Sequence, residues 1–322
     1  MINYKRLVER FMKYVRIDSE TGNEREFYLI LIEELKNLGL EVITDDSGKK
    51  AKSNANNIYC YLKNSNENKS RIFSSHMDTV KPGISIEPVI EDGLIKSKGD
   101  TILGADDKAG IAAIMESIHT ITEKKLEHNN IEIVFTISEE GGLKGSKNLN
   151  YDLLKSKEAY IIDSGSKVGT IINQAPAQYK IDFEVIGKSS HAGTAPENGI
   201  SAINVAAKAI SQMKLLRIDE ETTANIGSFN ADGETNIVNS KALFKAEARS
   251  LSNEKLEKQV NHMIEIVEKE TKESSAEVKI NKKFLYKSYK IDENETIIKN
   301  VEKIMKKLDI DVYKKSSGGG SD

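Results

Sequence analysis

The sequence has little cysteine or proline and no long hydrophobic run. One cysteine, Cys60, among 322 residues excludes a disulfide framework and is typical of a cytoplasmic protein. No run approaches the roughly 18 apolar residues that a membrane span needs, and the N-terminus shows no apolar signal core. Neither charge sign dominates, with 47 basic and 50 acidic residues and no basic stripe, so a nucleic-acid partner is not expected.

Hydrophobic residues make up 38% and charged residues 30% of the chain, which is the balance of a globular protein, and the length predicts two domains. Apolar residues at helical spacing alternate with short apolar runs. We expect helices over residues 7–15, 29–38 and 108–126, and strands over residues 57–62, 71–75, 131–137 and 159–163. This alternation predicts an α/β domain, a sheet with helices on both faces.

The pattern changes after residue 175. A strand (178–186), a helix (199–215), two strands (224–230 and 241–249), a helix (253–272) and a strand (276–280) follow in order. This order predicts a ferredoxin-like α+β module. A helix over 293–308 and a strand over 311–315 then resume the alternation of helix and strand seen before residue 175. We therefore expect one domain from residues 1–175 and 288–322, and an inserted domain from residues 176–287.

Acidic or imidazole side chains lie in four segments, 75–79, 104–108, 138–142 and 162–165, which follow predicted strands or begin the next helix. Ligands bind at that edge of an open α/β sheet. If the segments converge, six carboxylates would repel one another unless cations neutralise them. Mixed histidine and carboxylate ligation suits zinc, with manganese or cobalt possible. The candidates are His76, Asp78, Asp106, Asp107, Glu139, Glu140 and Asp163.

Each segment alone has an ordinary explanation. His76 could be a satisfied histidine at a strand end. Segment 104–108 could be a helix N-terminus with favourable first-turn charge, segment 138–142 a solvated loop, and segment 162–165 a turn. The four segments share one placement in the alternating pattern, and this favours a single metal site over four coincidences.

Taken together, His76-Met77-Asp78, segment 104–110, Glu139-Glu140 and Asp163 resemble the signatures of the co-catalytic zinc exopeptidases. That family includes peptidase T, carboxypeptidase G, aminoacylase and succinyl-diaminopimelate desuccinylase, and segment 103–112 is most similar to peptidase T, the tripeptide aminopeptidase. The resemblance covers nearly the whole chain. It implies a metal-binding α/β domain, an inserted ferredoxin-like lid that forms a homodimer, and short peptides as substrates.

The resemblance also implies a set of metal ligands. His76 and Asp163 would hold one zinc ion and Glu140 the other. Asp106 would bridge the two ions. A water molecule between such ions has a lowered pKa and becomes the nucleophile, with no covalent intermediate.

Three further residues match family positions that are not ligands. Asp78 would accept a hydrogen bond from the His76 ring and fix its tautomer. Glu139 would be the general base that takes a proton from the water and returns it to the leaving amine. His191 would donate to the oxyanion, reaching the active site of the partner subunit, although an exposed loop histidine would be the ordinary interpretation without the resemblance.

Asn236 and Arg249 resemble contacts to a substrate carboxylate. A bidentate guanidinium suits such a group, although Arg249 could equally be an ordinary surface residue. The segment that contains Gly319 and Gly320 resembles the start of a substrate-binding loop. These four residues are the predicted substrate contacts.

Family members continue past this glycine segment to a histidine that completes the zinc site begun by Glu140. This sequence ends at Asp322, so one of the two zinc sites is expected to lack that ligand. A non-catalytic metal-binding scaffold that dimerises is therefore an alternative. Another alternative is a carboxypeptidase or an N-acyl amino acid amidohydrolase of the same family, which would share the site and differ in its pocket.

Overall fold

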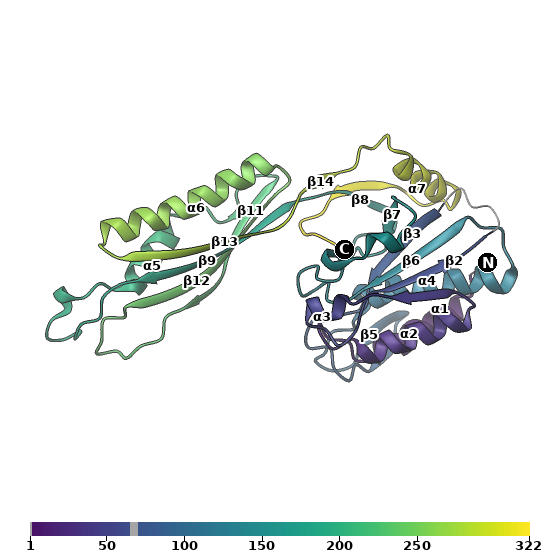
Figure 1. Ribbon diagram of the computed structural model, residues 1–322, viewed down its shortest axis with the longest axis horizontal. Helices are drawn as coiled ribbons and strands as arrows, with labels where there is room; N and C mark the ends of the chain where they lie inside the picture. Colours follow the sequence, from purple (N-terminus) through teal and green to yellow (C-terminus); the bar gives the residue numbers. More distant parts are fainter. Residues whose placement is uncertain (1, 65–69) are drawn as a thin grey trace. The chain divides into compact units, whose positions relative to one another are not determined.

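The computed structural model describes residues 2–64 and 70–322, which fold into two compact units (Figure 1). The first unit is Met1–Lys167 with Ser321–Asp322, and the second is Val168–Gly320. Each unit has its own hydrophobic core.

The first unit contains a five-stranded mixed sheet, in the part of the chain where the alternating pattern predicts an α/β domain. Its order is β1-β2-β6-β3-β7, and β3 runs parallel to both β6 and β7 while β2 is antiparallel to its neighbours. The carboxyl ends of β3, β6 and β7 therefore meet at one edge of the sheet. The strands are β1 (Glu41–Thr44), β2 (Ile58–Leu62), β3 (Ser70–His76), β6 (Asn130–Thr136) and β7 (Ala159–Ile161).

Three amphipathic helices, α1 (Tyr4–Val15), α2 (Arg25–Asn37) and α4 (Ala105–Lys124), bury their apolar residues in the main core of this unit. Figure 1 shows them beside the sheet, and fully buried side chains of this core include Tyr14, Phe27, Leu31, Met115 and Phe135. A smaller hydrophobic cluster of Tyr59, Ile72 and Val134 packs against leucines in and beside two short 3₁₀ helices, Ser146–Asn148 and Tyr151–Leu153. The unit also contains α3 (Ser47–Ala51) and a hairpin of β4 (Pro88–Glu91) and β5 (Leu94–Ser97).

The second unit contains the predicted ferredoxin-like module. Its antiparallel sheet has the order β10-β11-β12-β9-β13, with α5 (Ala202–Gln212) and α6 (Asn253–Glu273) packed against it. Alternate residues of β9 and β12 are buried, because the helices cover one face of the sheet. The strands are β9 (Ala177–Ile186), β10 (Leu216–Arg217), β11 (Thr222–Asn230), β12 (Lys241–Ser250) and β13 (Glu277–Tyr286).

A second, three-stranded sheet completes this unit. Its order is β14-β8-β15, formed by β8 (Thr170–Ala175), β14 (Tyr289–Lys290) and β15 (Tyr313–Ser316), and α7 (Thr296–Lys307) precedes the last strand. The helix and strand expected near the end of the chain are thus present with slightly shifted bounds. The domain boundaries at residues 175/176 and 287/288 stay a prediction.

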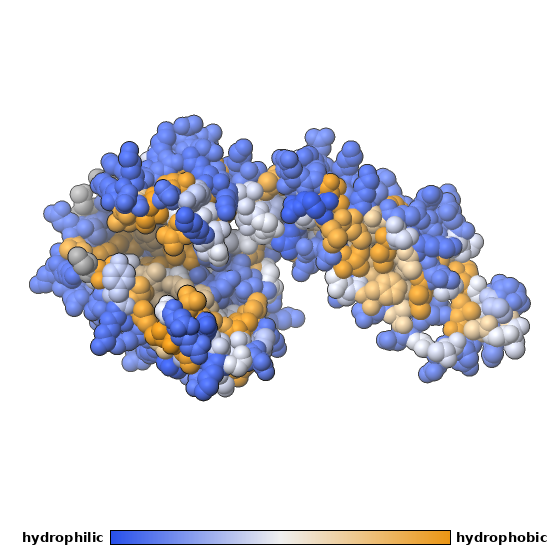
Figure 2. Space-filling model, turned by 180° about the vertical axis from the view of Figure 1, so that it is seen from behind, coloured by the Kyte–Doolittle hydropathy of each residue, from blue (hydrophilic) through white to orange (hydrophobic). Residues whose placement is uncertain are grey.

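Hydrophobic side chains also reach the surface of both units, as Figure 2 shows for one face. In the second unit they include Ile203, Leu216, Phe229, Ile237 and Leu243, whose exposed fractions range from 39% to 70%. Among residues 2–64 and 70–322, no helix combines the length and the apolar composition that crossing a membrane requires.

Candidate metal centre and active site

The first unit gathers its acidic and imidazole side chains at the carboxyl edge of its parallel strands. His76 is the last residue of β3, Glu139 and Glu140 follow β6, and Asp163 follows β7. Asp106 lies at the start of α4. The topology therefore brings together the four segments that the sequence analysis selected.

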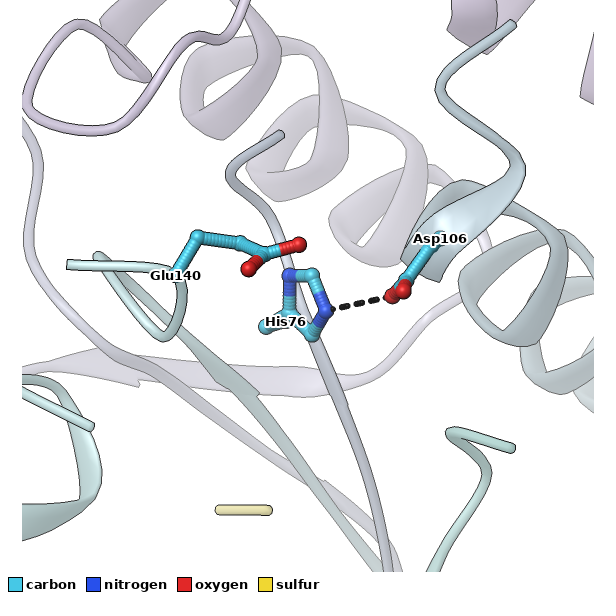
Figure 3. A group of neighbouring side chains, drawn as sticks. All are labelled: His76, Asp106 and Glu140. Atoms are coloured by element: carbon cyan, nitrogen blue, oxygen red, sulfur yellow. Dashed lines mark hydrogen bonds and ion pairs between the residues drawn. The ribbon is translucent and has the colours of Figure 1, made fainter. Parts of the chain in front are cut away.

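Two groups of ligand atoms result. Atoms of His76, Asp106 and Glu140 lie within 4.8 Å of one another, and so do atoms of His76, Asp107 and Asp163. Figure 3 shows the first group, with the Glu140 carboxylate turned toward the His76 ring. A nitrogen and several carboxylate oxygens at this spacing form a donor set that suits a zinc-type ion.

The His76 ring is held on both sides. Its Nε2 lies 2.9 Å from Asp106 Oδ1, and its Nδ1 lies 2.8 Å from the backbone carbonyl oxygen of Asp78. The Asp78 carboxylate is farther away, with Oδ1 3.5 Å from Nδ1. A proton on Nδ1 that bonds to the carbonyl leaves Nε2 as the nitrogen for a metal ion.

The Asp78 carboxylate has other partners. It accepts hydrogen bonds from the Thr21 hydroxyl at 2.6 Å and from the backbone N–H groups of Glu139 at 2.7 Å and Glu140 at 3.2 Å. The side chain of Asp78 is fully buried. It therefore fixes the segment that carries Glu139 and Glu140, in addition to facing His76.

The pKa values in the site reflect the crowding of negative charge. Burial alone would lower the pKa of His76, but hydrogen bonds to Asp106 and Asp78 and the charge of Asp107 raise it to about 12. The hydrogen bond from His76 lowers the pKa of Asp106. Burial raises the pKa of Asp107 to about 8, even though the Ser75 hydroxyl donates to its carboxylate. A bound divalent cation would offset this excess of negative charge, so the residues present fit a metal ion.

Glu139 and Glu140 differ in exposure, Glu139 being half-buried and Glu140 exposed. Burial raises the pKa of Glu139 to about 8, against the opposing charge of His76, and the carboxylates of Asp322 and Asp163 raise it further. Burial raises the pKa of Glu140 as well. A carboxylate with a pKa near neutrality is suited to proton transfer at physiological pH.

The last two residues contact this centre. The Ser321 hydroxyl donates to Asp163 Oδ2 at 2.7 Å, and the Asp322 carboxylate accepts from the Thr136 hydroxyl. Burial raises the pKa of Asp322. Sequence reasoning placed a loop here but did not select Ser321 or Asp322, since neither motif spacing nor periodicity marks them.

Within the second unit, Arg249 is already engaged. Its guanidinium donates to the Glu247 carboxylate at 2.9 and 3.2 Å and to the backbone oxygen of Gly318 at 3.1 Å. A Cβ atom at Gly319 would lie 3.4 Å from Arg249 Nη1, and Gly320 N–H donates to the Tyr286 hydroxyl at 3.2 Å. The arginine therefore holds the glycine segment in place.

His191 and Asn236 lie side by side on two loops of the second unit. The N–H of Ala192 donates to the Asn236 carbonyl at 2.8 Å. His191 Nδ1 accepts from the N–H groups of Gly193 at 3.1 Å and Thr194 at 3.2 Å. Because Nδ1 is an acceptor, a neutral His191 ring carries its proton on Nε2, and the residue is exposed.

Thr21, Glu24 and Ser75 are buried or half-buried partners of the site that the sequence analysis missed. Ser75 precedes His76, and this adjacency was the available signal. Thr21 and Glu24 lie far from their partners in the sequence, so no local spacing points to them.

Comparisons with known proteins agree with this geometry. Residues 57–192 match the model of "Peptidase family M28", and residues 176–275 match the "Peptidase dimerisation domain". The chain is 43% identical over its whole length to the uncharacterized protein YqjE of Bacillus subtilis (strain 168), covering 87% of that protein. It is 28% identical to peptidase T of Clostridium perfringens (strain SM101 / Type A), with 99% of this chain and 87% of that protein aligned.

A solved structure is also similar. The chain superimposes on a tripeptidase from Staphylococcus aureus subsp. aureus Mu50 with a TM-score of 0.96 and 43% identity, over 100% of this chain and 86% of the other. The α/β sheet with its His/carboxylate donor set, the dimerisation-domain match and these relatives together indicate a metallopeptidase. The chain belongs to the M20/M28 zinc exopeptidase family, among its peptidase T and tripeptidase-like members.

Proposed function

We propose that the protein is a metal-dependent exopeptidase that hydrolyses short peptides, tripeptides above all, from the amino end. The convergence of His76 with the four carboxylates of the two ligand groups is the observation that carries this proposal. The similarity to a tripeptidase and to peptidase T supports the choice of substrate. The single buried cysteine supports a cytoplasmic location.

Two zinc ions are the proposed cofactors, with manganese or cobalt as substitutes. His76 and Asp163 would hold one ion, Glu140 the other, and Asp106 would lie between them, while the position of Asp107 adds a carboxylate beside Asp163. When bound, such ions lower the pKa of a water molecule and polarise the scissile carbonyl.

Glu139 is the proposed general base. Its half-buried carboxylate, next in the chain to Glu140, takes a proton from the attacking water and gives it to the leaving amine. The Nε2–H of the exposed His191 is the proposed donor to the oxyanion, contributed across a homodimer. The match to a peptidase dimerisation domain supports that assembly.

Asn236, Arg249, Gly319 and Gly320 remain the proposed substrate contacts. Asn236 is exposed beside His191, so its amide can reach a peptide. Arg249 is hydrogen-bonded to Glu247 and Gly318. It would therefore contribute to substrate binding by holding the glycine segment in shape as well as by direct contact with the substrate.

Hydrolysis assays on the purified chain with added zinc, manganese or cobalt test the proposal. We expect tripeptides with a free amino terminus to be cleaved faster than dipeptides or N-acyl amino acids. Glu139→Gln should lower kcat by about 10²–10⁴-fold, because it removes the proton acceptor, while metal content stays unchanged.

Glu127→Gln is the matched control, since Glu127 is exposed and lies outside the site, and it should leave kcat unchanged. Preference for N-acyl amino acids would indicate an amidohydrolase instead. Two bound ions per chain without any hydrolysis would indicate a non-catalytic scaffold.

A further inference from the structure

We propose that Glu24 is a positioning residue for the segment that carries Glu139 and Glu140, a role that rests on the proposed function of those two residues. Glu24 precedes the first residue of α2, and it is fully buried. A carboxylate removed from water needs partners that offset its lost hydration. The partners of Glu24 identify the part of the molecule that it serves.

Those partners lie far along the chain. Glu24 Oε1 accepts from the backbone N–H of Ser138 at 3.0 Å and from the Ser138 hydroxyl at 2.9 Å. Glu24 Oε2 accepts from the Ser53 hydroxyl at 2.5 Å. The position is that of a helix N-cap, yet the side chain makes no capping hydrogen bond to α2. The carboxylate is therefore directed to Ser138, 114 residues away, and not to its own helix.

Ser138 has an unusual backbone. Its φ is +51°, in the left-handed region that residues with a Cβ rarely adopt, and it is fully buried. Two hydrogen bonds to a charged carboxylate stabilise this conformation, since such bonds are stronger than those between neutral groups. The conformation sets the direction in which the chain leaves β6.

The next two residues are held in the same way. The N–H groups of Glu139 and Glu140 donate to the Asp78 carboxylate at 2.7 and 3.2 Å. Three consecutive N–H groups, from Ser138 to Glu140, thus bind the buried carboxylates of Glu24 and Asp78. A general base and a metal ligand need this kind of preorganised backbone, because small displacements at a reacting centre cost much of the rate.

Close packing beside the Ser138–Glu140 segment also indicates that the loop before α2 supports it. A Cβ atom at Gly141 would lie 2.8 Å from the methyl group of Thr21, which is on the loop that precedes Glu24. Thr21 also donates its hydroxyl to Asp78. The loop between α1 and α2 is therefore the support for the Ser138–Glu140 segment, and Glu24 is its direct contact with the backbone there.

Three variants separate positioning from stability. Glu24→Ala removes all three bonds. Glu24→Gln keeps Oε1 as an acceptor for Ser138, and its amide can donate to Ser53. Ser53→Ala removes the hydrogen bond to Oε2 and the one that the N–H of Ala55 donates to the Ser53 hydroxyl, and it leaves both hydrogen bonds to Ser138 intact, so it is the matched control.

The first measurement is hydrogen exchange of the peptide that contains residues 138–143, in the chain with and without zinc. For Glu24→Ala we expect exchange to become about tenfold faster or more, as expected for the loss of a hydrogen bond to a charged group. Glu24→Gln and Ser53→Ala should exchange as the parent does. If Glu24→Ala does not fold, Ser138→Ala, which removes the hydroxyl bond alone, should show a smaller increase in the same peptide.

The second measurement is tripeptide hydrolysis by the zinc-loaded chain. Glu24→Ala should lower kcat about 10–100-fold with little change in KM, and Glu24→Gln should restore most of it. Unchanged exchange and kcat in Glu24→Ala, or equal losses in Ser53→Ala, would overturn the proposal. Exchange does not depend on activity, so an inactive parent chain would refute the proposed function while the hydrogen-exchange result still tested Glu24.

Discussion

Gly110 lies where a larger side chain has no room. A Cβ atom there would lie 2.3 Å from the backbone oxygen of Ile162 and 2.6 and 2.8 Å from the carboxylate oxygens of Asp107. Its N–H also donates to Asp107 Oδ1 at 3.3 Å. The start of α4 and the residues after β7 approach each other closely at this point, next to the candidate metal centre.

Gly110→Ala should therefore displace Asp107 or the start of α4. We expect a loss of about 1–3 kcal/mol in the free energy of unfolding, measured by urea denaturation, because overpacking a tight contact forces the neighbours to move. Zinc affinity should fall with it. Gly227→Ala is the control, since a Cβ at Gly227 meets nothing within 4 Å, and a loss of the same size there would contradict this explanation.

At the same scale, the sequence pattern predicted that His76, Asp106, Glu140 and Asp163 converge, because each ends or follows a strand or opens a helix at the ligand-binding edge. Their roles as ligands stay a prediction. The sequence pattern did not identify Glu24 as a partner of the site. That side chain meets a backbone N–H 114 residues away, and a backbone donor leaves no trace in the amino-acid pattern.

Among the elements, α1 and α4 are joined by charged side chains. The Glu116 carboxylate is almost fully buried and accepts from Arg6 at 2.7 and 2.8 Å and from Arg10 at 3.1 Å. Arg10 Nη2 also donates to Nδ1 of His119, at 3.1 Å. An arginine can only donate, so His119 is a neutral acceptor in this network.

This contact predicts a pH effect. Burial and the charges of Arg6 and Arg10 lower the pKa of His119, so the folded chain binds this proton less readily than the unfolded chain does. The contribution of His119 to stability is then present above its unfolded pKa of about 6.5 and declines as the pH falls below that value.

The free energy of unfolding should therefore decrease more between pH 7.5 and pH 5.5 for the parent chain than for His119→Gln. Glutamine keeps an acceptor for Arg10 but does not titrate. Equal decreases in the two proteins would show that His119 carries no part of the pH dependence.

Prediction of elements from the sequence succeeded where apolar runs or helical spacing were strong, as in β6 and α6. The predicted length of β13 was too short, since the strand was expected over residues 276–280 and extends to Tyr286 in the structure. The added residues include Lys282 and Lys283. β13 is an edge strand, and charged edge residues hide a strand from hydrophobic periodicity.

For the whole molecule, the two separate cores predict two unfolding steps. Phe244 is buried in the core of the second unit and stacks on Phe183 with ring centroids 4.6 Å apart. Cys60 is buried in the core of the first unit, and burial raises the pKa of its thiol, so it should resist thiol reagents until that unit opens.

Phe244→Ala should destabilise the second unit by about 3–5 kcal/mol. We expect the urea midpoint of Cys60 labelling to stay unchanged while a circular-dichroism transition moves to lower urea. Phe135→Ala, in the core of the first unit, is the counterpart that should move the labelling midpoint. Equal shifts from both variants would mean that the units unfold together.

The ferredoxin-like module begins and ends on neighbouring strands, since Gln178 of β9 pairs with Tyr286 of β13. A segment whose two ends are adjacent can be lengthened, shortened or exchanged without stretching the chain on either side. The module can therefore vary in evolution as a unit, separately from the domain into which it is inserted. Its loops, which present the proposed oxyanion donor His191 and the proposed substrate contact Asn236, can therefore change in length without displacing the candidate ligands at the sheet edge of the first unit.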